Sequence, residues 1–170
     1  MLIDLMKECN NYFFIFKITG KFVIDEDNNL IINRIINECK KINVITINSD
    51  YNKGIYLVNK VDVDKDNNKT IISLKDFESP VDLDLGVIFF SFVPLPFRNL
   101  ANEIKEEVTN NDNLKPTKNI ITSESLGEYS YTKATAPNGE LMTWRYVYKD
   151  DLKKYRKLFA GYEYVRELEV

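Results

Sequence analysis

The chain of 170 residues has no histidine, only two cysteines, and six glycines that are spread along its length. Without histidine it lacks His-based acid–base catalysis, Ser-His and Cys-His nucleophile pairs, and imidazole metal ligands. The glycines form no phosphate-binding loop. Cys9 and Cys39 lack the spacing of metal ligands, and a reducing compartment would keep both as buried thiols. We therefore expect no enzyme activity, no metal and no cofactor.

Long hydrophobic runs are also missing. The longest apolar stretch, Val87 to Pro96, is shorter than the roughly 20 residues that a membrane-spanning helix needs, and Ser91 interrupts it. The start, Met1-Leu2-Ile3-Asp4, lacks the basic residues of a secretory signal. We expect no membrane association and a protein that is made and kept in a cytoplasm.

The net charge of −3 argues against a general electrostatic affinity for DNA, although local basic patches remain open. Hydrophobic residues make up 44% and charged residues 29%, which is typical of a globular chain rather than a disordered one. One acidic segment, Asp62 to Asp66, begins like a calcium-binding loop. Asn67 stands where such a loop needs glycine, and Ser73 where it needs glutamate. The segment is therefore predicted to be a charged hairpin turn.

The first half of the chain reads mainly as strands after a short helix. Apolar residues at three- and four-residue steps predict a helix over Leu2 to Tyr12. Leu30 to Lys41 fits either a strand or a helical face, and we favour a short helix after one strand. β-Branched and aromatic residues between polar turns predict a small antiparallel sheet or barrel. Its strands are expected at Phe14 to Ile24, Val44 to Asn48, Ile55 to Val63, Thr70 to Leu74 and Leu85 to Val93.

The second half reads as two helices separated by a long loop. Pro94 and Pro96 favour a helix start, and one apolar face continues to Thr109. Residues 110–142 are too long and too polar for an inert loop inside a compact domain. A final amphipathic helix is predicted from about Thr143, as its N-cap, to Phe159, with Gly161 ending it.

These elements predict an α+β fold, in which a small antiparallel β module is inserted between an N-terminal helix and two C-terminal helices joined by a long extended loop. The expected domains are residues 1–93, the N-terminal helix with the β module, and residues 94–170, a helical region with the loop at 110–142 and a C-terminal tail.

Basic residues of the last helix form the best candidate contact for nucleic acid. Lys149, Lys153, Arg156 and Lys157 share one face and could contact DNA or an acidic partner. The alternative is structural, because basic residues in the last turns of a helix complement its dipole and their long stems cover apolar surface.

The most specific segment is Ile121-Thr122-Ser123-Glu124-Ser125-Leu126-Gly127-Glu128-Tyr129-Ser130-Tyr131-Thr132, which a packed core would not require. Its alternation of Tyr with Ser and Thr favours an extended strand once a partner edge is found. Together with Val93-Pro94 leading into a helix, Thr143-Trp144 opening the last helix and Tyr155-Arg156-Lys157 closing it, the segment resembles the head–tail connector (adaptor, head-completion) proteins of tailed bacteriophages.

The resemblance is best over Gly86 to Phe159, and the first 85 residues are similar to one lineage of these proteins. It implies a structural virion protein of the neck that is made in a bacterial host. Such proteins form a homo-oligomeric ring, commonly dodecameric, that docks beneath the portal protein at the capsid vertex. Double-stranded DNA passes through the lumen, and a head-closure or tail-completion protein binds below.

On this resemblance we expect the subunit or portal interface to include the loop segment and two aromatic residues of the last helix. Gly127 would permit a backbone geometry or a close approach that a side chain would hinder. Two alternatives stay open: another neck component, namely a head-closure or tail-completion protein, and a monomeric bacterial β-module adaptor that binds nucleic acid or peptide. The expected interface residues are Ser123, Glu124, Ser125, Leu126, Gly127, Glu128, Tyr129, Ser130, Tyr131, Trp144 and Tyr155.

Overall fold

The computed structural model describes residues 1–75, 77, 81–111, 123–126, 129–132, 143–158, 161–162 and 165–168, with the backbone alone at 81–82, 123–126 and 129–132. Contacts divide the chain into two compact units. The helical unit comprises Met1–Asn11 and Leu95–Phe159, and the barrel unit comprises Tyr12–Pro94 and Ala160–Val170. This division differs from the predicted one, which had a single boundary after residue 93. The first helix belongs to the helical unit, and the C-terminal tail belongs to the barrel unit.

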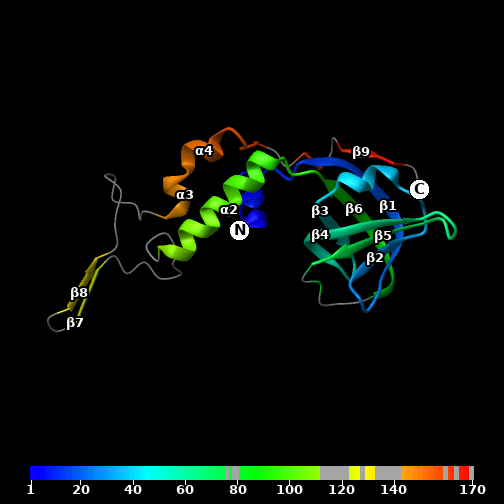
Figure 1. Ribbon diagram of the computed structural model, residues 1–170, viewed down its shortest axis with the longest axis horizontal. Coiled ribbons are helices and arrows are strands. Elements are labelled where there is room, and N and C mark those ends of the chain that lie inside the picture. Colours follow the sequence, from blue (N-terminus) through cyan, green and yellow to red (C-terminus); the bar gives the residue numbers. More distant parts are fainter. Residues whose placement is uncertain are drawn as a thin grey trace. The chain divides into compact units, whose positions relative to one another are not determined.

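The barrel unit is a closed antiparallel β-barrel of six strands (Figure 1). Around the barrel the strand order is β1-β2-β5-β4-β3-β6, and the pairing of β1 with β2 and with β6 closes it. Strands β3, β4 and β5 are consecutive hairpins, and β6 returns beside β3, which is a Greek-key arrangement. The strands are β1 (Phe14–Ile24), β2 (Asn29–Ile32), β3 (Val44–Ser49), β4 (Lys53–Asp64), β5 (Lys69–Leu74) and β6 (Val81–Ser91).

Alternating apolar residues fill the barrel interior. Along β3, Ile45 and Ile47 are at most 1% exposed, and they face buried residues of β6 in register. The rings of Phe16 and Phe90 stack with their centroids 4.5 Å apart. Full burial of a side chain of this size contributes roughly 1.5–3 kcal/mol. The interior is therefore the main source of stability of this unit.

Aspartates shape two of the hairpin turns. Asp25 accepts hydrogen bonds from the backbone N–H groups of Asp27 and Asn29 between β1 and β2. Asp64 accepts from Asp66 and Asn67 between β4 and β5, and its hydrogen bonds from Asn67 hold its pKa below the ordinary value. The segment that begins like a calcium loop thus forms a hairpin turn, as predicted.

The ambiguous segment after β2 contains both predicted types of structure. Asn29–Ile32 pairs with β5 as a strand, and a short 3-10 helix, η1 (Asn37–Lys41), follows it. The hydroxyl of Thr70 links the two parts, because it donates to the backbone oxygen of Arg34 and accepts from the N–H of Ile36. The buried Cys39 anchors η1 to the barrel core.

The C-terminal tail returns to the barrel instead of extending the helical unit. Strand β9 (Arg166–Glu167) pairs with β1 in parallel. Glu167 binds Lys17 at 3.3 Å and accepts a hydrogen bond from Thr19 at 2.5 Å, and these contacts lower its pKa. This placement of the tail was not predicted.

The helical unit contains four helices and a hairpin among its described residues (Figure 1). Its buried centre comprises Leu5, Met6, Cys9, Phe97, Ala101, Ile104, Trp144, Tyr148 and Leu152. The helices are α1 (Leu2–Glu8), α2 (Leu95–Asn110), α3 (Trp144–Val147) and α4 (Lys149–Lys153), and the hairpin strands are β7 (Ser123–Leu126) and β8 (Tyr129–Thr132). No helix among the described residues is long and apolar enough to cross a membrane.

The prediction of one continuous helix over 143–159 is wrong. The backbone breaks at Tyr148, which has φ −97° and ψ 14°, and α4 ends at Lys153, well before Gly161. Thr143 occupies the N-cap position but makes no side-chain capping bond. Aromatic and β-branched residues dominate α3, and such residues lower helix propensity.

Tertiary hydrogen bonds replace the last turns of the predicted helix. Asn11 donates to the backbone oxygen of Tyr155 at 2.8 Å, and the N–H of Lys157 donates to the oxygen of Cys9 at 2.9 Å. The segment after α4 is therefore fixed against the residues that follow α1.

Candidate interface hairpin and basic hollow

The segment that was most specific in the sequence forms a β-hairpin. β7 and β8 pair antiparallel, with Ser123 opposite Thr132 and Leu126 opposite Tyr129. Gly127 and Glu128, which separate the two strands, lie outside the described residues, as does most of the predicted loop at 110–142. The extended conformation expected for this segment is present in both strands.

The register gives the hairpin two unlike faces. Residues directly opposite each other share a face, and successive residues of a strand alternate between faces. One face, which we call the tyrosine face, carries Glu124, Leu126, Tyr129 and Tyr131. The other face, which we call the hydroxyl face, carries Ser123, Ser125, Ser130 and Thr132.

Both outer edges of the hairpin are open within the described part of the chain. β7 and β8 form a sheet of their own, and neither joins the barrel strands. An isolated two-stranded hairpin is at best marginally stable in water, and an open edge can accept a further strand. The hairpin thus has the features of an element that is completed by a partner.

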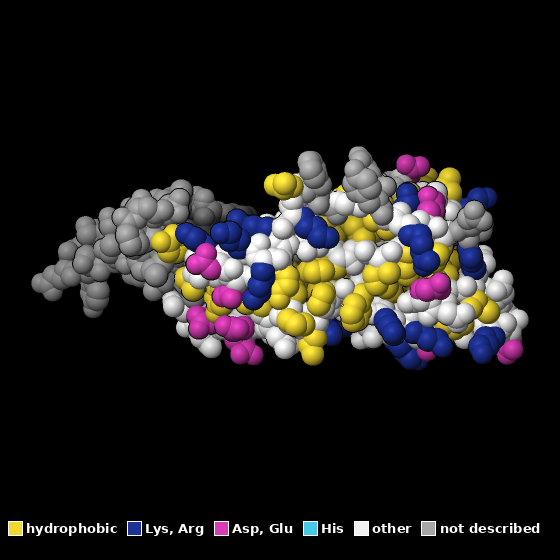
Figure 2. Space-filling view, turned by 90° about the horizontal axis from the view of Figure 1, so that it is seen from above, with side chains coloured by type: hydrophobic (Ala, Val, Ile, Leu, Met, Phe, Trp, Pro, Cys, Tyr) yellow, Lys and Arg dark blue, Asp and Glu magenta, His cyan; other side chains and the backbone are white. Residues whose placement is uncertain are grey.

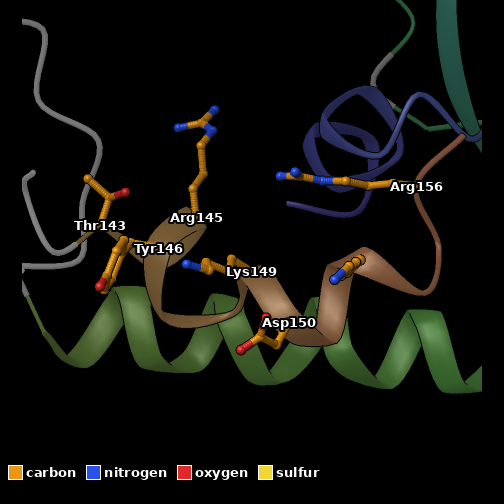
Figure 3. A pocket seen from close by; sticks show the side chains of 7 residues that line it. Thr143, Arg145, Tyr146, Lys149, Asp150 and Arg156 are labelled. Atoms are coloured by element: carbon orange, nitrogen blue, oxygen red, sulfur yellow. The ribbon is translucent and has the colours of Figure 1, made fainter. Parts of the chain in front are cut away.

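The second candidate site, which we call the basic hollow, is a depression of about 570 Å³ in the helical unit. Figure 3 shows side chains of α3, of α4 and of the segment after α4 around it. It is lined by Thr143, Arg145, Tyr146, Lys149, Asp150, Lys153 and Arg156.

The hollow has an excess of positive charge. Four cationic side chains line it against the single carboxylate of Asp150. In Figure 2, which is seen from above, several dark blue Lys and Arg side chains of the helical unit lie close together, with magenta acidic side chains beside them. Such a surface can hold phosphate or carboxylate groups.

Glu8 of α1 positions the two arginines of the hollow. Its carboxylate binds Arg145 Nε at 2.7 Å and Arg156 Nη2 at 3.2 Å. Arg145 also lies over the ring of Trp144, 4.6 Å from its centroid. The charge of Glu8 partly neutralises the same arginines, so it fixes their geometry and limits the attraction of the hollow for anions.

The predicted basic residues are only partly brought together. Lys149, Lys153 and Arg156 line the hollow, whereas Lys157 is exposed but is not among the lining residues. Arg145 belongs to the site but was not singled out as a contact residue. Its spacing of four residues from Lys149 is the signal that could have identified it.

The two aromatic residues predicted at the interface lie inside the helical unit. Trp144 is 2% exposed, so its side chain packs in the core of the helical unit. Tyr155 is half-buried, with its ring edge-on to Phe97 at 4.8 Å. Both side chains thus take part in the packing of the helical unit, and their role at a subunit or portal interface stays a prediction.

Tyr148, at the break between α3 and α4, completes this core. Its hydroxyl donates to Glu103 of α2 at 3.4 Å. Burial raises the pKa of Tyr148, and the carboxylates of Glu107 and Glu103 raise it further. The phenol therefore stays protonated and anchors the break in the helix to α2.

No protein-family model, curated protein or solved structure matches this chain. A functional assignment thus depends on the hairpin, on the basic hollow, and on the resemblance of the segment around Ser123 to Thr132.

Proposed function

We propose that this chain is the subunit of a head–tail connector (adaptor) ring of a tailed bacteriophage. The ring docks beneath the portal protein at the capsid vertex, and DNA passes through its lumen. A head-closure or tail-completion protein then binds below it. In this role the chain has a structural function in the virion and no catalytic one.

The observation that carries the proposal is the hairpin of β7 and β8. It contains the residues on which the resemblance to connectors rests, and it pairs with no other strand of the described chain. A ring subunit needs a segment that joins its neighbour or the portal, and the contact is repeated around the ring. Open edges and a face with two tyrosines suit such a segment.

The basic hollow gives a second line of support. A connector meets the phosphates of the DNA that it conducts and acidic surfaces of other neck proteins. Lys149 and Lys153 supply positive charges for such contacts, while Glu8 holds Arg145 and Arg156 in place. The net negative charge of the whole chain then limits non-specific binding elsewhere.

The test is cryo-electron microscopy of the chain mixed with the portal protein encoded beside it, compared with the portal alone. We expect additional density that forms a ring on the outer, tail-facing end of the portal. An intact portal without added density would contradict the proposal.

Matched variants test whether the hairpin makes the contact. Tyr129→Ser together with Tyr131→Ser changes the tyrosine face, and Ser125→Ala together with Ser130→Ala changes the hydroxyl face. We expect the first pair to abolish ring formation on the portal and the second to leave it intact. Gly127→Val should also reduce assembly, and its assembly at wild-type efficiency would count against a requirement for glycine there.

The order of assembly separates the connector from the other neck components. A connector binds to heads that carry only the portal, whereas a head-closure or tail-completion protein binds only after the connector has been added. Failure on portal-bearing heads followed by binding to connector-bearing heads would therefore move the assignment to a lower neck protein.

The basic hollow favours one further candidate, a monomeric adaptor that binds nucleic acid through the helical unit. This candidate predicts a chain that stays monomeric with the portal and binds DNA with a steep dependence on salt. Sedimentation with the portal and DNA titrations at several salt concentrations distinguish it from a connector.

A further inference from the structure

A groove of about 380 Å³ lies on the outer face of the barrel. Its volume is at the small end of the roughly 300–1,000 Å³ that is usual for binding pockets. Thr46, Ile47 and Asn48 of β3 and Lys53, Gly54 and Ile55 of β4 line it, together with Phe89 of β6 and Tyr162.

One end of the groove is aromatic. Tyr162 packs on Phe89 with ring centroids 5.1 Å apart, and on Phe14 at 4.9 Å. Phe14 in turn contacts Phe89 at 5.0 Å and stacks on Tyr12 at 5.4 Å. Since each ring is fixed by others, Phe89 and Tyr162 provide a rigid wall for a further ring.

The floor of the groove contains a hydroxyl without a partner. Thr46 pairs with Ile55 and Phe89 of the neighbouring strands and is 8% exposed. Its Oγ1 is buried and has no hydrogen-bond partner among the described residues. An unsatisfied buried hydroxyl is costly, so a ligand that brings a hydrogen-bonding group gains from reaching it.

The other end of the groove is cationic. Lys53 is exposed and forms no ion pair among the residues that the structure describes. Its position is fixed by the β3–β4 turn, where the buried Asp84 accepts a hydrogen bond from Asn52 at 2.9 Å and lies 2.5 Å from the Ser49 hydroxyl. The groove thus combines an aromatic wall, a free hydroxyl and a lysine on a rigid frame.

The tyrosine face of the hairpin has the complementary groups. Glu124 and Tyr131 are directly opposite in the register, so a carboxylate and a phenol occur as neighbours on one face. Thr46 and Lys53 lie on the diagonal of the β3–β4 pair, at a separation of roughly 7–8 Å. Glutamate and tyrosine side chains are long enough for Glu124 and Tyr131 to match the separation of Lys53 and Thr46.

We propose that the groove binds the tyrosine face of the hairpin from a second copy of this chain. Tyr131 packs against Phe89 and Tyr162, with its phenol at the hydroxyl of Thr46, and Glu124 pairs with Lys53. Each copy carries both a groove and a hairpin, so the contact is head-to-tail, and it forms a ring when the rotation from copy to copy closes. The inference rests on the proposed function, because it names the partner of the hairpin in a connector ring.

The direct test uses a fluorescent cyclic peptide of residues 122–133 and the full chain, without any portal. We expect the peptide to bind and Lys53→Glu to weaken binding at least tenfold. The Glu124→Lys peptide should bind poorly to the wild-type chain and regain affinity for the Lys53→Glu chain. Lys65→Glu, in the exposed β4–β5 turn, is the control for general electrostatics and should leave binding unchanged.

Thr46→Val is a second, independent variant. It removes a hydroxyl that has no hydrogen-bond partner in the part of the chain that the structure describes, so the melting temperature should stay the same or rise. Peptide affinity should nevertheless fall severalfold. Absence of peptide binding, or binding that neither Lys53→Glu nor Thr46→Val changes, would overturn the inference.

Full-length charge reversals show whether the contact joins two copies. Lys53→Glu and Glu124→Lys chains should each fail to form rings on the portal, and an equal mixture of the two should restore them. Restoration only when both changes are in one chain would mean that each groove holds its own hairpin, and would overturn the assignment to a second copy. If every variant still forms wild-type rings, the groove–hairpin contact is refuted but the connector function is not. If the peptide binds but the chain forms no ring on the portal, the connector function is refuted.

Discussion

Replacement of Asp84 tests how the barrel holds the rim of the groove. Asp84 is 2% exposed, and its carboxylate accepts from Asn52 Nδ2 at 2.9 Å and lies 2.5 Å from Ser49 Oγ. In Asp84→Ala the serine keeps an alternative acceptor, the backbone oxygen of Asn52 at 2.6 Å, but the buried amide of Asn52 loses its partner. One hydrogen bond to a charged group contributes about 1.5–3 kcal/mol.

We therefore expect Asp84→Ala to lower the free energy of unfolding by about 2–3 kcal/mol, which corresponds to roughly 4–12 °C in melting temperature for a chain of this size. A urea titration that is monitored by far-UV circular dichroism measures this change in the free energy of unfolding. Asp84→Asn keeps one acceptor oxygen and should lose less. Asp62→Ala removes an exposed carboxylate that pairs with the exposed Lys60 and with no other cation among the described residues, and should change stability by less than about 0.5 kcal/mol. A loss in Asp84→Ala no larger than in Asp62→Ala would refute the reasoning.

Three further changes test other parts of the structure. Glu8→Gln removes a negative charge that partly neutralises two arginines of the basic hollow. The repulsion between this charge and a DNA phosphate at roughly 6 Å in water is about 0.7 kcal/mol, so affinity for a short DNA duplex should rise about threefold in a filter-binding titration. Unchanged affinity would exclude the hollow from DNA contact. Gly86→Ala places a Cβ 2.5 Å from the backbone oxygen of Asn48 and should destabilise the barrel by about 1–3 kcal/mol in a thermal melt, while full wild-type stability would show that β3 can move away. Burial raises the pKa of Cys39 to about 12, so its thiol should resist maleimide at pH 8 until the chain unfolds. Because the folded-state pKa is the higher one, the stability contributed by this neutral thiol is complete below about pH 9 and is lost as the pH rises towards 12; a Cys39→Ala chain with the same alkaline decline would contradict this.

The strands could be predicted from the sequence because their apolar residues alternate between clear turns. β1 occupies Phe14–Ile24 as expected, and β3, β4 and β5 lie within two residues of their predicted bounds. The sequence left an open sheet and a closed barrel as alternatives and did not decide between them. Closure depends on the two-residue pairing of Val23 and Ile24 with β2, and such a pairing leaves no signal in either strand alone.

Helix ends were less predictable because tertiary contacts decide them. The apolar spacing around Trp144 and Leu152 is helical, but Tyr148 breaks the helix and still places all three side chains in the core. After α4, the backbone groups that would continue the helix instead bind Asn11 and Cys9, about 145 residues earlier in the chain. No local sequence pattern shows this competition between helical and tertiary hydrogen bonds.

The candidate sites could likewise be predicted where local strand geometry decides them, but not where tertiary contacts do. The hairpin register could be anticipated from the alternation of Tyr and Ser, because strand geometry alone places alternate residues on one face. The pairing of Glu8 with Arg145 and Arg156 could not, since Glu8 in α1 is separated from Arg145 in α3 and from Arg156 after α4 by most of the sequence. The aromatic wall of the groove likewise needs Tyr12 and Tyr162 to meet.

Barrel closure also limits how this chain can join other copies. Each of the six barrel strands has partners on both sides along at least part of its length, so little of the barrel backbone is free to accept another strand. A partner must therefore recognise side chains on the outer face of the barrel, where the groove combines rings, a hydroxyl and a lysine. The hairpin has a tyrosine face, and neither of its outer edges pairs with another strand of the described residues. If the tyrosine face fills the groove of a neighbour, the edges remain free for a third chain, and one hairpin can join a neighbouring subunit and a portal segment at the same time.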